Sequence, residues 1–231
     1  MLKQIVDFHT HILPGIDDGS KSVDCSLEML KEEKEQGIKT LVFSSHFNAM
    51  NESVDDFILR RQKAFDSIKN VCFELGITTF LGAEIKYFKG ISKSEEIKKL
   101  CIGNTKFLLL EMPYYKWNDF DVEEILSLRT NIGVLPVLAH IERSYKANKK
   151  AIERLAFEGV NMQMNAEYFL SYFTKKKAAS FVEKGWVNFI GSDCHNTSSR
   201  KPNIMMAIPV LEKYCSPDAL DQMYSFQTLI K

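Results

Sequence analysis

Short runs of β-branched, aliphatic and aromatic residues alternate with longer amphipathic segments along the whole chain. The runs predict strands at 2–9, 40–45, 78–83, 107–112, 134–139, 160–165 and 186–190. The amphipathic segments predict helices at 24–36, 53–75, 94–100, 121–130, 149–158, 174–185 and 203–214, and one that Ser216 and Pro217 begin. Strands alternating with helices form mostly parallel sheets. Seven such units without a linker in 231 residues predict one domain over residues 1–231, an α/β barrel resembling a TIM barrel. The alternative is an open doubly wound sheet.

Charge and cysteine usage exclude several classes of protein. Thirty basic and thirty acidic residues leave no net charge, so the chain has no general attraction to nucleic acid or to an anionic membrane. No apolar run approaches the ~20 residues of a membrane span, and no secretory leader is recognisable. The five cysteines contain no Cys-x-x-Cys pair, which argues against a disulfide framework or a thiolate zinc site. We therefore expect a cytoplasmic protein that neither binds nucleic acid nor inserts into a membrane.

His9 and His11 stand one residue apart at the end of the first predicted strand. Alternate side chains of an extended chain share a face, so both imidazoles can reach one point. The turn-forming run at 14–19 follows directly and carries two carboxylates, Asp17 and Asp18, within reach of that point.

All five histidines lie at or just beyond the carboxyl end of a predicted strand: His9, His11, His46, His140 and His195. Three carboxylates lie at the same position relative to their predicted strands: Glu84, Glu111 and Asp193. Taken singly, each could be a hydrogen-bonded core or rim residue. In a parallel barrel, however, these ends converge on the face that carries active sites, and so many carboxylates there would repel one another without a cation. Imidazole and carboxylate ligands suit manganese, iron or zinc, and their number predicts two or three divalent ions.

Six segments in fixed order resemble a known family. They are His9-x-His11 with 12–19, Ser45-His46, Gly82-Ala83-Glu84, Leu110-Glu111-Met112-Pro113-Tyr114, Ala139-His140-Ile141-Glu142-Arg143 and Ser192-Asp193-Cys194-His195-Asn196. Together they are similar to the PHP (polymerase and histidinol phosphatase) superfamily, and within it to the bacterial protein-tyrosine phosphatases of capsular and exopolysaccharide operons. The motifs cover residues 7–200, nearly the whole chain.

The resemblance implies a distorted seven-stranded (β/α) barrel with up to three divalent ions, most often manganese, at the carboxyl ends of the strands. It implies that one ion is held by His9, His11, Glu84 and Asp193, that Glu84 bridges to a second held by Glu111 and His140, and that Asp18, His46 and His195 hold the third. It further implies that Arg143 and Arg200 bind phosphate. The implied substrate is phosphotyrosine on the tail of a membrane-associated tyrosine autokinase that controls polysaccharide export. The loop at 47–50 departs from the basic pattern of some members, because it contains no arginine.

Two mechanisms for such a phosphatase compete in the sequence. In the first, metal ions lower the pKa of a bound water towards ~7, so that hydroxide attacks phosphorus in line while Arg143 and Arg200 neutralise the developing charge. In the second, Cys194 and Arg200, spaced as Cys-x5-Arg, would act as in cysteine-dependent phosphatases. That loop contains no glycine, and the neighbouring Asp193 opposes thiolate formation. The sequence favours the metal mechanism and predicts that Cys194 points away from the site.

Three other functions stay open. A small-molecule phosphatase of the same superfamily, such as one for histidinol phosphate, is the nearest, but Asp18 stands where such relatives usually supply histidine. Neutral charge disfavours a nuclease or proofreading module, and the complete ligand set disfavours an inactive scaffold. Several aromatic residues near the predicted mouth could hold an aromatic ring or simply pack: Tyr114, Tyr115, Trp117, Tyr168, Phe169, Tyr172 and Phe173.

Overall fold

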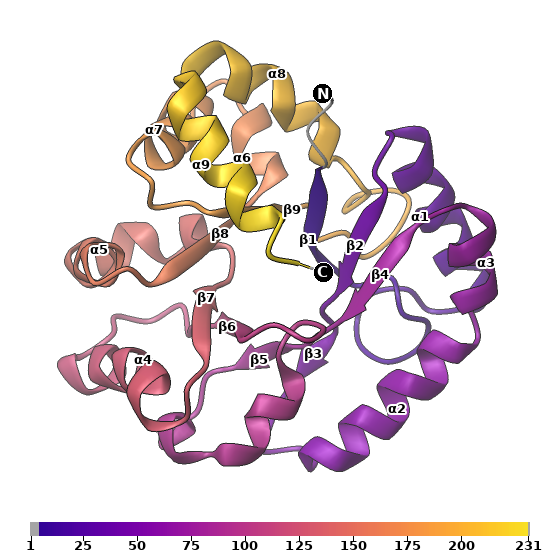
Figure 1. Cartoon of the computed structure of the whole chain (residues 1–231), viewed down its shortest axis with the longest axis horizontal. Helices are drawn as coiled ribbons and strands as arrows, with labels where there is room; N and C mark the ends of the chain where they lie inside the picture. Colours follow the sequence, from indigo (N-terminus) through magenta and orange to yellow (C-terminus); the bar gives the residue numbers. More distant parts are fainter. Residues whose placement is uncertain (1–4, 231) are drawn as a thin grey trace.

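The computed structural model describes residues 5–230, in which short strands curl into a ring with helices around the outside (Figure 1). The strands are β1 (Val6–Thr10), β2 (Thr40–Phe43), β3 (His46–Phe47), β4 (Thr78–Leu81), β5 (Glu84–Lys86), β6 (Phe107–Glu111), β7 (Leu135–Leu138), β8 (Asn161–Asn165) and β9 (Phe189–Gly191). The helices are α1 (Val23–Glu35), α2 (Val54–Asp66), α3 (Lys69–Glu74), the 3-10 turns η1 (Ile91–Lys93) and η2 (Glu95–Leu100), α4 (Asp119–Asn131), α5 (Ile141–Phe157), α6 (Ala166–Leu170), α7 (Lys175–Glu183), α8 (Ile204–Tyr214) and α9 (Pro217–Gln227). Residues 2–4 of the first predicted strand lie outside the described residues.

Every pair of adjacent strands is parallel, as the alternating pattern predicts. The strands form two sheets, in the orders β1-β2-β4 and β3-β5-β6-β7-β8-β9. Two short interruptions separate β2 from β3 and β4 from β5, at 44–45 and 82–83. The segment after β9 returns to β1, because the Asp193 amide donates to the His9 carbonyl (2.8 Å) and the His11 amide to the Cys194 carbonyl (3.0 Å). The first and last strands are therefore neighbours.

A register irregularity in β1 lies directly below the histidine pair. The pairing of β1 with β2 shifts between Asp7 and Thr10. The buried carboxylate of Asp7 accepts the amides of His9 (3.2 Å) and Ser192 (2.9 Å). Since an irregular strand leaves backbone donors without ladder partners, Asp7 satisfies two of them at the junction of β1 with the β9 segment.

Two apolar clusters hold the ring together. The inner one contains Val6, Phe8, Val42, Ile102, Phe107, Leu109, Val137, Ala139, Phe189 and Ile230. The rings of Phe8 and Phe189 stack there with centroids 4.0 Å apart, which packs β1 against β9. A larger cluster lies between the strands and the surrounding helices. Burial of these apolar surfaces is the main favourable term in folding and leaves the polar residues at the strand ends to build a site.

Two helix starts follow the capping signals, whereas several other predictions differ from the structure. The helix predicted at 94–100 is the 3-10 helix η2, and α6 was not predicted. Ser53 and Ser216 accept hydrogen bonds from the first turns of α2 and α9. The single helix predicted at 53–75 is wrong: the Ser67 hydroxyl bonds the Ala64 carbonyl, and Ile68 leaves the helical region at φ −124° while its side chain packs in the core. The helix predicted from 149 begins at Ile141, directly after β7.

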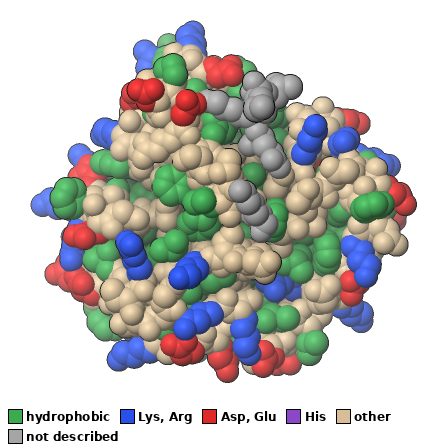
Figure 2. Space-filling view, viewed as in Figure 1, with side chains coloured by type: hydrophobic (Ala, Val, Ile, Leu, Met, Phe, Trp, Pro, Cys, Tyr) green, Lys and Arg blue, Asp and Glu red, His purple; other side chains and the backbone are tan. Residues whose placement is uncertain are grey.

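The surface shown in Figure 2 mixes hydrophobic, acidic and basic side chains, and no histidine is visible on this face. Among residues 5–230, no helix is both long enough and apolar enough to span a membrane.

Candidate metal centre

The structure brings all nine predicted ligands to one mouth of the ring, where His46 follows the carboxyl end of β2 and Glu84 follows that of β4. His9 lies in β1 and His11 just after it, Asp18 in the following loop, His46 in β3, Glu84 at the start of β5, Glu111 at the end of β6, His140 after β7, and Asp193 and His195 after β9. They therefore come from seven separate stretches of chain, and only the curl of the sheet brings them together.

His9 and His11 face the same point, as strand alternation predicts. Their Nε2 atoms lie 3.0 Å apart. Glu84 Oε2 lies 3.1 Å from the first and 3.3 Å from the second. Asp193 Oδ1 lies 3.6 Å and 3.4 Å from the same two nitrogens. These four side chains are almost completely buried, so their donor atoms converge away from bulk water.

Glu84 is the hub of the cluster. Its Oε1 lies 2.8 Å from His140 Nε2, and its Oε2 lies 3.0 Å from His46 Nδ1. His140 Nε2 in turn lies 3.5 Å from Glu111 Oε1. Donor atoms of His46, Glu84 and Glu111 fall close enough together to share an ion, as do those of His9, His11 and Glu84. Both oxygens of the Glu84 carboxylate therefore contact imidazoles of the cluster.

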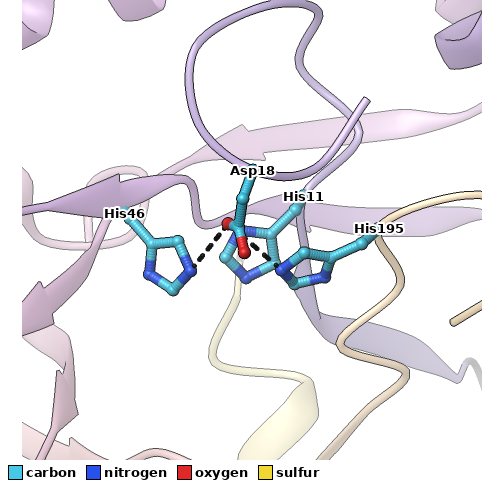
Figure 3. A group of neighbouring side chains, drawn as sticks. All are labelled: His11, Asp18, His46 and His195. Carbon is cyan, nitrogen blue, oxygen red and sulfur yellow. Dashed lines mark ion pairs between the residues drawn. The ribbon is translucent and has the colours of Figure 1, made fainter. Parts of the chain in front are cut away.

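A third group lies toward solvent (Figure 3). Asp18 Oδ1 lies 3.1 Å from His46 Nε2 and 3.4 Å from His195 Nε2, and His11 lies behind them. These four residues also offer donor atoms close enough to share one ion. Asp18 is 63% exposed, whereas His195 is 3% exposed and its Nε2 has no hydrogen-bond partner among residues 5–230. A buried ring nitrogen that faces a carboxylate but makes no hydrogen bond is suited to bind a metal ion.

The pKa shifts of the clustered residues also favour a metal-binding site. Burial opposes charge on His11, yet the hydrogen bonds that its ring donates to Asp17, Asp193 and Glu84 outweigh burial and raise the pKa of His11 well above its usual value. Burial likewise disfavours the charged form of Glu84, but the surrounding histidines hold the pKa of Glu84 well below its usual value. Burial and the neighbouring His11 lower the pKa of His195 to about 4. The carboxylates therefore demand positive charge, which divalent cations can supply in place of imidazole protons.

Two polar residues support the histidines: Asp17, which the sequence placed within their reach but without this role, and Gln163, which was not predicted. Asp17, rather than Asp18, accepts from His11 Nδ1 (2.8 Å) and from the His46 amide (3.0 Å). In β8, Gln163 Oε1 lies 3.1 Å from His9 Nδ1 and accepts the His140 amide at 2.7 Å. The contacts at Nδ1 orient the rings of His9 and His11 so that both Nε2 atoms point into the cluster. The sequence signal was present: polar residues alternate with methionine in β8.

The backbone is adapted to bring ligands close together. His140 (φ 30°) and Asp193 (φ 53°) are the two non-glycine residues with positive φ in the described part of the chain, and both belong to the cluster. Gly191 is required beside His9, since an added Cβ would lie 2.5 Å from the His9 Cβ. Strained φ values of this kind persist where the surroundings over-determine them, which is typical of functional sites.

Arg143 and Arg200 meet at Asp193. Both guanidinium groups contact Asp193 Oδ2, at 2.5 Å and 2.7 Å, and Asn165 donates to the same oxygen at 2.8 Å. The other oxygen, Oδ1, faces the histidines. Beside the two arginines is an open cavity of about 410 Å³, lined also by Ser192, Ser198 and Lys201. Both guanidinium groups therefore border this cavity while they are paired with Asp193.

Cys194 points away from the cluster. It is completely buried, and its Sγ lies 3.9 Å from Glu33 Oε1 on α1. Burial and the neighbouring carboxylates raise the pKa of the Cys194 thiol well above its usual value. The thiol is thus neither accessible nor ionised at neutral pH, which excludes the Cys-x5-Arg interpretation.

Some of the aromatic residues predicted near the mouth are buried in the core, and others are exposed. Trp117 and Phe169 are core residues. Tyr114 is 57% exposed, donates its hydroxyl to Glu111 (3.0 Å) and stacks over His140 at 6.4 Å. Tyr115, Tyr172 and Phe173 are exposed. Tyr114 is therefore the one of these aromatics that the structure places directly against the cluster.

A curled parallel sheet with five histidines and five carboxylates at one mouth, beside two arginines, is typical of metal-dependent α/β hydrolases. Comparison with known proteins identifies the family. The family model for capsular polysaccharide synthesis, CpsB/CapC, matches residues 5–227, and the chain belongs to this family.

Similar proteins include the tyrosine-protein phosphatase CpsB of Streptococcus agalactiae serotype III (strain NEM316), which is 29% identical over 98% of both chains. The tyrosine-protein phosphatase CpsB of Streptococcus pneumoniae is 31% identical over 90% of both. The crystal structures of YwqE from Bacillus subtilis and CpsB from S. pneumoniae, described as metal-dependent tyrosine phosphatases, include a chain that superimposes with a TM-score of 0.81 at 25% identity, covering 98% of this chain and 94% of that one.

Proposed function

We propose that this protein is a metal-dependent protein-tyrosine phosphatase, a phosphoric monoester hydrolase. The observation that carries the proposal is the juxtaposition at Asp193: one carboxylate oxygen faces the histidine cluster and the other holds Arg143 and Arg200. A phosphate bound by the arginines would then lie beside the cations. Family membership and the named activity of the similar streptococcal proteins support the same substrate.

The nine ligands fit two to three divalent ions, with manganese the first choice and iron or zinc as alternatives. His9, His11, Glu84 and Asp193 would hold one ion, Glu84, Glu111 and His140 a second, and Asp18, His46 and His195 a third. The contacts of His46 with Glu84 and of His11 with the outer group also suit ions that share ligands. Bound ions would supply an activated water and neutralise phosphate charge.

The remaining steps fall to side chains of the chain itself. Arg143 and Arg200 would leave Asp193 in part to grip the equatorial phosphate oxygens, where charge develops during in-line attack. Tyr114 would lie against the phenyl ring of the substrate, since it is exposed beside His140. A phenolate leaving group, with a pKa near ~10, departs without strong general-acid help.

We further propose the cellular setting and the finer architecture. Residues 1–231 would form one domain, and if β2–β3 and β4–β5 each count as one interrupted strand, the ring becomes a distorted seven-stranded barrel of the PHP type. The protein would act in the cytoplasm on a phosphotyrosine-bearing protein, with a membrane-associated tyrosine autokinase of polysaccharide synthesis as the expected partner.

The test is hydrolysis of a phosphotyrosine peptide by the purified protein, stripped of metal and then resupplied with manganese. Activity should vanish on stripping and return with metal. Arg143→Met and Arg200→Met should each lower kcat/KM by at least about tenfold, since each removes a charge-assisted contact. Histidinol phosphate serves as the comparison substrate, and a kcat/KM for it above that for the peptide would replace this proposal with a small-molecule phosphatase.

A further inference from the structure

A second hollow, of about 440 Å³, lies between the start of α4 and the middle of α5, outside the metal centre. Five exposed basic residues line it: Lys116, Lys146, Lys149, Lys150 and Arg154. We call it the basic hollow. The chain as a whole has no net charge, so this concentration of cations is a local feature.

Acidic neighbours neutralise only part of the basic hollow. Arg154 is paired with Glu123 at 2.5 Å, and Lys149 lies 3.9 Å from Glu153. Asp119 also lines the hollow. In contrast, Lys116, Lys146 and Lys150 form no ion pair within residues 5–230. Three ammonium groups around one concave surface are thus available to an external anion.

The floor of the basic hollow is a built structure. Asn148 is buried in the middle of α5, where its own backbone leaves the helical region (φ −120°, ψ 24°). Its side chain accepts the Trp117 amide at 2.7 Å and donates to the Tyr115 carbonyl at 3.1 Å. These hydrogen bonds attach the segment after β6 to α5. The backbone positions of Lys116 and Lys146 are therefore fixed relative to each other.

Two elements connect the basic hollow to the metal centre. The segment after β6 runs from Glu111, a predicted ligand, past Tyr114 to Lys116. On α5, Arg143 and Lys146 are three residues apart and so are neighbours on the helix surface. A peptide whose phosphotyrosine lies at Arg143 and Tyr114 would therefore continue naturally over the exposed Tyr115 toward the lysines.

We propose that the basic hollow binds acidic residues that flank the phosphotyrosine of a protein substrate. This inference rests on the proposed phosphatase function and adds its sequence preference. Lysine ammonium groups pair readily with carboxylates as point charges. A nucleic acid is the poorer fit, because its binding depends on a long basic track that neutralises many phosphates, whereas only three lysines here are unpaired.

The experiment compares the double variant Lys146→Glu/Lys150→Glu with Lys39→Glu/Lys106→Glu. The control lysines are equally exposed but precede β2 and β6, at the opposite ends of the strands from the metal centre. Three substrates are used with the manganese-loaded protein: a phosphotyrosine peptide with glutamates around the tyrosine, the same peptide with glutamines, and p-nitrophenyl phosphate.

We call the Lys146→Glu/Lys150→Glu protein the hollow variant. Its KM for the glutamate peptide should be about tenfold higher with kcat unchanged, because two exposed lysines that attract the glutamates become glutamates that repel them. KM for the glutamine peptide and for p-nitrophenyl phosphate should stay within about twofold, and the control variant should match wild type. Equal effects on both peptides, or equal effects of both variants, would overturn the inference.

A binding measurement separates this inference from the phosphatase proposal. Fluorescence anisotropy with the glutamate peptide carrying phenylalanine in place of phosphotyrosine requires no catalysis. Wild type should bind it more tightly than the hollow variant does, and salt should weaken the binding. If no substrate is hydrolysed, the phosphatase proposal fails while this readout still tests the hollow. Equal peptide affinities in the two proteins, or a single-stranded oligonucleotide that binds the hollow more tightly than the peptide, would contradict the inference.

Discussion

Replacing Gln163 with leucine should weaken the metal centre without touching any ligand. Gln163 Oε1 accepts from two buried donors, the His140 amide (2.7 Å) and the His9 ring at Nδ1 (3.1 Å). Leucine is similar in volume but accepts nothing. Each orphaned donor costs about 1–3 kcal/mol, so the free energy of unfolding should fall by about 2–6 kcal/mol. Loss of such an orienting contact typically lowers metal affinity by about 10–100-fold.

The matched control is Gln227→Leu. Gln227 is also a buried glutamine whose Oε1 accepts a backbone amide, that of Val6 at 3.0 Å, but at the other end of β1. It should cost about 1–3 kcal/mol of stability and leave metal affinity unchanged. Thermal unfolding and calorimetric titration with manganese measure both quantities. If the two variants bind manganese with wild-type affinity and differ only in stability, the orienting role assigned to Gln163 is refuted.

Three further predictions follow from the buried groups of the site. Cys194→Ser should retain phosphatase activity within about threefold, because the thiol faces Glu33 and not the cavity; loss of activity in a variant that still binds manganese would revive a role for the thiol. Burial and the nearby Asp7 raise the pKa of Glu33 well above its usual value, so the folded protein holds a proton that the unfolded chain releases. The free energy of unfolding should therefore fall, by up to about 1.4 kcal/mol per pH unit, as pH rises above the pKa of Glu33 in the unfolded chain. Glu33→Gln should reduce this pH dependence in denaturant titrations at pH 5–8. An unchanged slope would show that Glu33 is ionised in the fold. Chelation should lower the melting temperature, by an amount equivalent to about 2.7 kcal/mol for a metal present at 100 times its dissociation constant, and an unchanged melting temperature would argue against bound ions.

Local patterns in the sequence accounted for the parallel α/β class and for the positions of the nine predicted ligands near the ends of strands. Strand periodicity puts His9 and His11 on one side, and parallel strands put their carboxyl ends together, whatever the details of packing. Capping residues likewise placed the starts of α2 and α9. The break at Ser67 escaped prediction because the apolar spacing continues across it, and burial of Ile68 in the core decides the bend.

Only the tertiary structure decided which polar residues support the ligands. Asp17 and Asp18 are adjacent and chemically identical, and the path of one loop makes the first an orienting partner of His11 and places the second, more exposed, against His46 and His195. Gln163 reaches His9 from a strand more than 150 residues away. The amino-acid sequence by itself determines what is local: the period of each element and the residue types at its ends. Contacts across the ring depend on strand register and on the curl of the sheet, which are set by burial of the whole core, so they become visible only once the chain has folded.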